Sequence, residues 1–154
     1  LSRRYLATVL DAGEFAKLSL LTPEAFFADA TAGFQLCVNI DSFAEMEAPT
    51  VLAYLRQIAR TCGRFYTKNP VGKYRDESLS TSMNRDEASL ALRTGLLREV
   101  LDIHDNRAVA AQRQHFLDAY RPGEDWTVLA DDWARPWSYY WQAVYRRPPA
   151  GTED

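Results

Sequence analysis

An apolar run that ends abruptly in polar residues is the feature that most constrains the fold of this 154-residue chain. The run covers Phe34 to Ile40, and polar residues follow from Asp41 to Glu45. A buried parallel strand has this pattern, because both of its faces are covered and its carboxyl end carries side chains to the edge where α/β folds bind ligands. We therefore expect an α/β fold whose functional residues begin at Asp41.

The composition is that of an ordinary globular protein, with 47% hydrophobic and 25% charged residues. A chain of this length forms one domain that buries roughly 70% of its unfolded surface. A net charge of -3 gives no basis for binding nucleic acid or a membrane, and no run approaches the ~20 apolar residues of a membrane helix. The two cysteines, Cys37 and Cys62, lack metal-type spacing, so we expect reduced thiols in a cytoplasmic protein.

Hydrophobic periodicity predicts alternating helices and strands along the chain. We expect a helix over 2–10 with Gly13 after its end, a strand over 15–21, and a short helix capped by Thr22 and opened by Pro23. The apolar positions of the helix that begins at Ala48 or Pro49 and stops at Gly63 are Val51, Leu52, Leu55, Ile58 and Ala59. The remaining predicted segments are a strand over 64–67, a turn-rich loop over 68–74, a mobile polar segment over 75–88, two helical pieces over 87–120 broken near 103–106, and strands over 126–130 and 139–146.

This alternation predicts a parallel sheet with right-handed crossovers. The last two strands are joined by the short link 131–138, which permits only antiparallel pairing. We expect a parallel sheet that ends in an antiparallel hairpin, in one domain over 1–147 followed by a flexible tail over 148–154.

Several segments resemble the sugar O-methyltransferase family, whose members depend on S-adenosylmethionine and have the Rossmann-like methyltransferase fold. The segments that carry the resemblance are Val38-Asn-Ile-Asp-Ser-Phe-Ala-Glu-Met46, Tyr54-Leu55, Phe65-Tyr66-Thr-Lys-Asn-Pro70, the opening Arg4-Tyr5-Leu6 and the ending Trp126, Trp137 and Tyr145-Arg146. The resemblance covers nearly the whole chain but only the C-terminal two-thirds of the family.

The resemblance implies a sheet of order 3-2-1-4-5-7-6 in which strand 7 is antiparallel. Residues 15–21, 34–40 and 64–67 would be the parallel strands 3, 4 and 5, and residues 126–130 and 139–146 would be strands 6 and 7. Strands 1 and 2 are missing, and with them the glycine-rich turn and the acid that hold the cofactor; none of the seven glycines forms G-x-G. We expect that the chain alone is poorly stable, or that strand 3 pairs directly with strand 4.

The same resemblance places functional residues after strands 4 and 5. It implies that Asp41, Ser42, Phe43 and Met46 bind the cofactor and that Asp41 and Glu45 are the catalytic carboxylates, since either can accept a proton from a sugar hydroxyl. The alternative is a helix cap at Asp41 or Ser42 and a solvated acid at Glu45. The residues that would bind the acceptor are Asn69, Lys73 and Tyr74, and the alternative there is an ordinary Asn-Pro turn.

Other candidates have simpler explanations. His104 and His115 are the two histidines of the chain and could act as bases, but surface positions explain them better. Asp131 and Asp132 could hold a divalent ion, yet a turn accounts for them, and we expect no metal. Trp126 and Trp141 fit core packing, whereas Trp133 and Trp137 are the better candidates for a sugar-binding surface.

We expect an S-adenosylmethionine-dependent O-methyltransferase that acts on a sugar hydroxyl of a small molecule or glycan, truncated so that the activity of this chain alone stays open. The alternative is a non-catalytic α/β module that binds a sugar or a protein. An α/β domain of another class has less support, because the chain contains neither a phosphate-binding P-loop nor a Gly-x-Ser-x-Gly elbow.

Overall fold

The computed structural model describes residues 2–29, 33–74 and 89–149. The chain divides into two compact units, residues 1–30 and 31–154. A single domain over 1–147 stays a prediction. The predicted mobile segment over 75–88 and most of the predicted tail lie outside the described residues.

The first unit contains the short helices α1 (Ser2–Val9), α2 (Ala12–Phe15) and α3 (Pro23–Ala28). The predictions of α1 and α3 are confirmed. The Thr22 hydroxyl accepts a hydrogen bond from the Ala25 backbone N–H at 3.3 Å, and Pro23 occupies the first turn, where its missing N–H costs nothing.

The predicted strand over residues 15–21 is wrong. A capping box starts α2 instead: the Asp11 carboxylate accepts from the Glu14 N–H at 2.8 Å and Glu14 accepts from the Asp11 N–H at 3.2 Å. Gly13 therefore lies inside this helix and does not follow a helix end. No described strand pairs with residues 16–22, so nothing holds their backbone in a ladder, and the predicted pairing of strand 3 with strand 4 is wrong as well.

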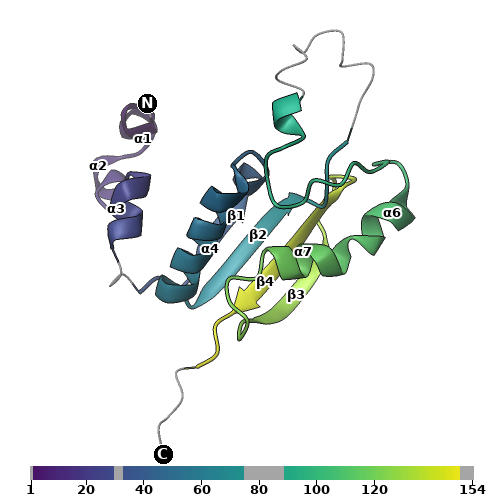
Figure 1. The fold of residues 1–154 in the computed structure, drawn as a ribbon. Helices are drawn as coiled ribbons and strands as arrows, with labels where there is room; N and C mark the ends of the chain where they lie inside the picture. Colours follow the sequence, from purple (N-terminus) through teal and green to yellow (C-terminus); the bar gives the residue numbers. More distant parts are fainter. Residues whose placement is uncertain (1, 30–32, 75–88, 150–154) are drawn as a thin grey trace, which may run out of the picture. The chain divides into compact units, whose positions relative to one another are not determined.

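The second unit is built on a four-stranded sheet of order β1-β2-β4-β3. Its strands are β1 (Cys37–Ile40), β2 (Arg64–Pro70), β3 (Thr127–Trp133) and β4 (Tyr140–Arg146). β1 and β2 are parallel, and β4 is antiparallel to both β2 and β3, which confirms the predicted parallel pair and antiparallel hairpin. Consequently β1, β2 and β3 run in one direction and end at the same edge of the sheet (Figure 1).

Two strands are longer than predicted. β2 continues three residues past Thr67 to Pro70. β3 continues to Trp133, because Asp131 and Asp132 pair with Ala143 and Gln142 of β4. The two acids therefore lie in a strand, not in a turn, and the link between β3 and β4 is confined to residues 134–139.

One face of the sheet is covered by α4 (Ala48–Thr61) and α7 (Arg113–Ala119), with α6 (Asn106–Ala111) beside α7 (Figure 1). In α4 the side chains of Val51, Leu55 and Ile58 are buried, as their helical spacing predicts, whereas Leu52 is 43% exposed. The long helical prediction is partly wrong, since residues 92–105 are not helical and Val100 forms an isolated parallel bridge with Lys73; Asp105 then caps α6.

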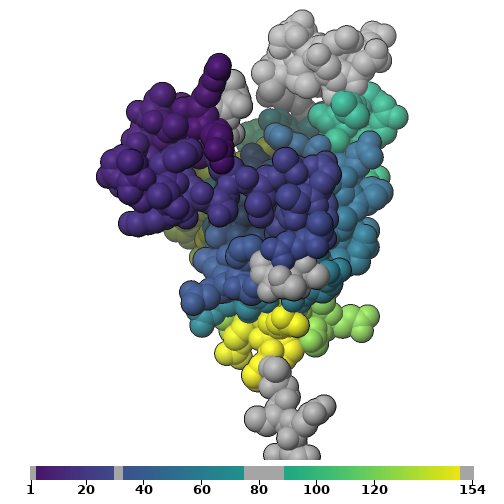
Figure 2. Space-filling view, turned by 90° about the vertical axis from the view of Figure 1, so that its left-hand side faces the viewer, coloured from purple at the N-terminus to yellow at the C-terminus, as the bar shows by residue number. Residues whose placement is uncertain are grey.

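The core lies between the sheet and these helices. Its large buried side chains include Phe43, Val51, Leu55, Ile58, Phe65, Val109, Phe116, Tyr120, Trp126, Trp141 and Tyr145. The opposite face is open along β1 and the segment before it, where alternate residues are large, apolar and exposed: Phe34 42%, Leu36 52%, Val38 53% and Ile40 54%. Figure 2 presents the side of this unit on which β1 and α4 lie.

Replacing Phe65 with alanine tests this core. Phe65 is fully buried between the rings of Phe43 and Tyr145, at 6.3 and 6.0 Å. The Phe65→Ala substitution is expected to lower the free energy of unfolding by about 3–5 kcal/mol in urea titrations. Leu129→Ala, at a position 46% exposed, is the control and should cost less than about 1 kcal/mol. Equal losses at the two positions would contradict the assignment of this core.

Candidate functional site

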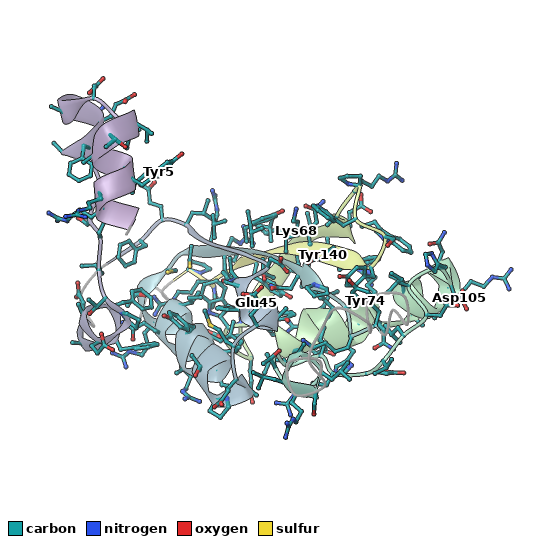
Figure 3. All side chains as sticks on the ribbon, turned by 90° about the horizontal axis from the view of Figure 1, so that it is seen from above. Tyr5, Glu45, Lys68, Tyr74, Asp105 and Tyr140 are labelled. Atoms are coloured by element: carbon teal, nitrogen blue, oxygen red, sulfur yellow. The ribbon has the colours of Figure 1, made fainter. Side chains whose placement is uncertain are left out.

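Three loops meet at the edge of the sheet where β1, β2 and β3 end. They are residues 41–46 after β1, residues 71–74 after β2 and the link 134–139 after β3. Because the three strands are parallel to one another, their carboxyl ends place these loops together. Figure 3 looks down on this edge, with Glu45, Tyr74 and Tyr140 labelled.

Asp41 is the residue most tightly constrained at this edge. Its backbone has φ 67° and ψ -31°, and it is the one described non-glycine residue with positive φ. Its N–H donates to the Lys68 carbonyl at 2.8 Å, and the Tyr140 hydroxyl donates to Asp41 Oδ1 at 2.7 Å. A left-handed non-glycine residue costs about 1–3 kcal/mol and persists where its surroundings hold it, which is common at functional sites.

A cluster of aromatic rings lies beside Asp41. Tyr139 packs edge-on against both Tyr74 and Tyr140, each at 5.0 Å between ring centroids, and Trp137 lies 5.6 Å from Tyr140. Burial and the hydrogen bond to Asp41 raise the pKa of Tyr140, and burial together with Tyr74 raises the pKa of Tyr139 to about 12. These phenols stay protonated at neutral pH, so they act as hydrogen-bond donors.

The loop after β1 is anchored through the carbonyl of Ala44. This oxygen accepts from the Lys73 ammonium at 3.0 Å and from the Thr94 hydroxyl at 2.8 Å, and the Gly95 N–H donates to the Met46 carbonyl at 2.7 Å. Burial and the nearby Arg98 lower the pKa of Lys73. The segment around residue 94 therefore holds the loop in place, and the Lys73 charge is engaged in that task.

A buried chain of polar side chains runs beneath the same loop. The Asn69 amide donates to Asn39 Oδ1 and to the Thr67 hydroxyl, both at 2.7 Å, and the Asn39 amide donates to the Ser42 hydroxyl at 2.6 Å. Asn69 is fully buried, and no donor among the described residues hydrogen-bonds its Oδ1. A buried acceptor without a donor costs about 1–3 kcal/mol.

The structure places the residues predicted after β1 in different surroundings. Asp41 is half-buried, Ser42 and Glu45 are exposed, and Met46 is half-buried against the core. Phe43 is 3% exposed and stacks on Tyr120 at 6.3 Å, so its ring belongs to the core. The cofactor and catalytic roles of these residues stay predictions.

The residues predicted after β2 reach the same edge. Asn69 is the next-to-last residue of β2, the Lys73 ammonium donates to the Ala44 carbonyl, and the Tyr74 ring packs on Tyr139. Their acceptor-binding role also stays a prediction. The alternative of an ordinary Asn-Pro turn is wrong, because Asn69 and Pro70 both lie within β2.

The remaining candidates lie elsewhere. His104 and His115 are exposed. Asp131 accepts two hydrogen bonds from Arg113 and one from Trp141, so these donors satisfy its carboxylate oxygens and explain its position without a metal. Trp126 and Trp141 are buried, as predicted for core packing, and Trp137 is 53% exposed.

Among residues 2–29, 33–74 and 89–149, no cluster of three or more histidine, cysteine or acidic side chains is arranged to hold a metal. No helix in these ranges has the length and apolarity needed to cross a bilayer.

Tyr139 and Tyr140 were not identified as site residues from the sequence. The direction of β3 is the feature from which their position could have been predicted. Once β4 is inserted antiparallel between β2 and β3, β3 must run parallel to β2, and its following link must reach the edge that carries Asp41.

No protein-family description and no curated protein matches the chain. A solved structure described as "PigF with SAH" aligns with 79% of the chain at 15% sequence identity, with a TM-score of 0.40. The chain spans 33% of the length of that structure. A TM-score of this size does not establish a shared fold.

Replacing Gly95 tests the anchoring of the loop after β1. Gly95 has φ 76°, and an added Cβ would lie 3.2 Å from the Ala44 carbonyl oxygen. Gly95→Ala is expected to lower the free energy of unfolding by about 1–3 kcal/mol and to speed amide exchange over residues 42–46. The control is Gly33→Ala, where an added Cβ meets nothing within 4 Å. Unchanged exchange in Gly95→Ala would contradict the anchoring role.

The buried tyrosines predict a loss of stability at alkaline pH. Burial raises the pKa values of Tyr120, Tyr139, Tyr140 and Tyr145 above the ordinary value of 10.0. Above about pH 10 the unfolded chain therefore binds fewer protons than the folded chain, and the free energy of unfolding falls as pH rises. Urea titrations at about pH 9 and about pH 11 should show this fall, and Tyr140→Phe should reduce it.

The matched control for that titration is Tyr5→Phe, because Tyr5 is 65% exposed. This variant should leave the alkaline fall unchanged. An equal reduction in the two variants would contradict the burial argument.

Proposed function

We propose that this chain forms the part of an S-adenosylmethionine-dependent O-methyltransferase that supplies strands 4 to 7 and the acceptor side of the active site. One observation carries the proposal. The sheet order β1-β2-β4-β3, with β4 antiparallel to both neighbours, corresponds to the order 4-5-7-6 of the methyltransferase sheet. The motif resemblance around Asp41 points to the same fold independently of the geometry.

The open side of β1 is consistent with this proposal. In the methyltransferase order, strand 1 lies next to strand 4. Among the described residues, β1 has a neighbour on one side only, and its exposed side chains include Val38 and Ile40. An adjoining strand and helix would pair that edge and cover those side chains.

The residues present fit one part of the cofactor. A sulfonium is cationic, and the Asp41 carboxylate and the rings of Tyr74, Tyr139 and Tyr140 form an environment that favours a cation. The nucleoside part has no cradle at the glycines nearest the site, because the Cβ positions of Gly72 and Gly95 are filled by Glu99, Leu101 and Ala44. When bound, S-adenosylmethionine supplies a methyl group already activated by the positive sulfur.

The chain's own residues would position the acceptor and take its proton. Tyr140 holds Oδ1 of Asp41, which leaves Oδ2 to accept the proton of a sugar hydroxyl. Glu45 is the second carboxylate of the loop. Ser42 and Met46 would line the cofactor side, with Phe43 supporting the loop from the core, and Asn69, Lys73 and Tyr74 would shape the acceptor side. Holding the oxygen in line with the methyl group would supply most of the rate.

Cofactor binding and turnover test this proposal. Isothermal titration of S-adenosylmethionine should give binding by the chain extended upstream along its source DNA and none by these 154 residues alone. Methyl transfer by the extended chain to a sugar should fall about 10²–10⁴-fold in Asp41→Asn, because the general base is lost. Asp132→Asn, an exposed acid on β3, is the control. An extended chain that binds no cofactor would contradict the proposal and favour a non-catalytic module.

A further inference from the structure

An exposed indole ring and a lysine ammonium lie together at the edge of the sheet. Trp137, in the link between β3 and β4, is 53% exposed. The Lys68 ammonium lies over its ring, 5.8 Å from the centroid. Among the described residues, the Lys68 ammonium has no carboxylate and no hydrogen-bond acceptor as a partner. The charge of Lys68 is therefore available to a ligand.

This pair is continuous with Asp41. The Trp137 ring packs on Tyr140, whose hydroxyl donates to Asp41 Oδ1. Lys68 is tied to the same residue through its backbone, since its carbonyl accepts the Asp41 N–H. Lys68 and Tyr140, both labelled in Figure 3, are linked through the Trp137 ring. A ligand on the indole ring would therefore lie next to the Asp41 carboxylate.

We propose that Lys68, Trp137 and Tyr140 form a subsite for the acceptor and that the acceptor is an anionic sugar, one that carries a carboxylate or a phosphate. This inference deepens the proposed function and rests on it. The apolar face of a sugar ring packs on an indole, and the Asp41 carboxylate accepts a hydrogen bond from a sugar hydroxyl. A charge-assisted hydrogen bond is stronger than an exposed cation–π contact, so the ammonium leaves the ring to bind the anion.

The charges at the site determine the orientation in which the sugar binds. The second nearby lysine, Lys73, is already engaged by Ala44 and Thr94. The Asp41 carboxylate repels an anionic group but accepts a hydrogen bond from a hydroxyl. The anionic group is therefore directed to Lys68 and a hydroxyl of the same sugar to Asp41, which orients the acceptor for transfer.

Sugar titrations of the upstream-extended chain, without cofactor, test the subsite, and dispersed amide resonances show that each variant is folded. D-glucose, D-glucuronate and glucose 6-phosphate are added while the tryptophan indole N–H resonances are followed by NMR, with the Trp137 signal assigned from Trp137→Phe. At least one anionic sugar should bind about tenfold more tightly than glucose, since one charge-assisted contact is added. Lys68→Met should abolish that difference, and Trp137→Ala should weaken binding of all the sugars.

Lys17→Met is the matched control, because it removes the same charge from an exposed position in the other unit. It should preserve the preference. A preference for glucuronate alone or for the phosphate alone supports the subsite and identifies the anion. Equal affinity for the charged and neutral sugars, a preference that survives Lys68→Met, or no movement of the Trp137 signal would overturn it. Because these titrations contain no cofactor, their outcome does not depend on whether the chain binds S-adenosylmethionine, and the two proposals can fail independently.

Discussion

The hydrogen-bonded ladder between β2 and β4 is the constraint on which the rest of the structure depends. It pairs residues from Arg64 with Arg146 to Pro70 with Tyr140. Because β4 is antiparallel to both β2 and β3, β3 runs parallel to β2, so the link after β3 reaches the edge that carries the other loops. Its register puts Tyr140 at that edge, within 2.7 Å of Asp41. A slip of one residue would turn every side chain of β4 to the other face and break this contact.

The two faces of the sheet have different roles at this site. On the covered face, Phe43 packs among the core rings and fixes the loop that follows β1. On the open face, Val38 and Ile40 are more than half exposed, and burying either would contribute on the order of 1 kcal/mol. Asp41 lies where β1 ends, between these faces. That position explains how one loop can be anchored by the core and still be available to a ligand.

The elements that were predictable from the sequence are those with strong periodicity. The apolar run before Asp41 marks β1, although the strand covers only Cys37–Ile40 and, contrary to the prediction, one of its faces is exposed. The spacing of Val51, Leu55 and Ile58 marks α4, and the short link after β3 requires a hairpin. The strand predicted over residues 15–21 is wrong because alternate leucines also occur in segments that pair with no strand. A strand forms only when a neighbouring strand shares its backbone hydrogen bonds. The local capping box at Asp11 decided the structure there.

The candidate site was predictable only in part, for a similar reason. Polar residues after β1 and β2 are visible in the chain, because each follows a strand directly. Tyr140 is 99 residues from Asp41, and only the register of β4 brings the two together. The engagement of Lys73 with Ala44 likewise depends on how the loops pack, which periodicity does not encode.

The central claim is that the loops after β1, β2 and β3 form one acceptor site around Asp41. A crystal structure of the upstream-extended chain with S-adenosylhomocysteine and a sugar acceptor tests it most directly. The account predicts a sugar hydroxyl within about 3 Å of the Asp41 carboxylate, on the line from the cofactor sulfur. Cofactor or sugar bound away from this edge, with Asp41 out of hydrogen-bond reach, would contradict it.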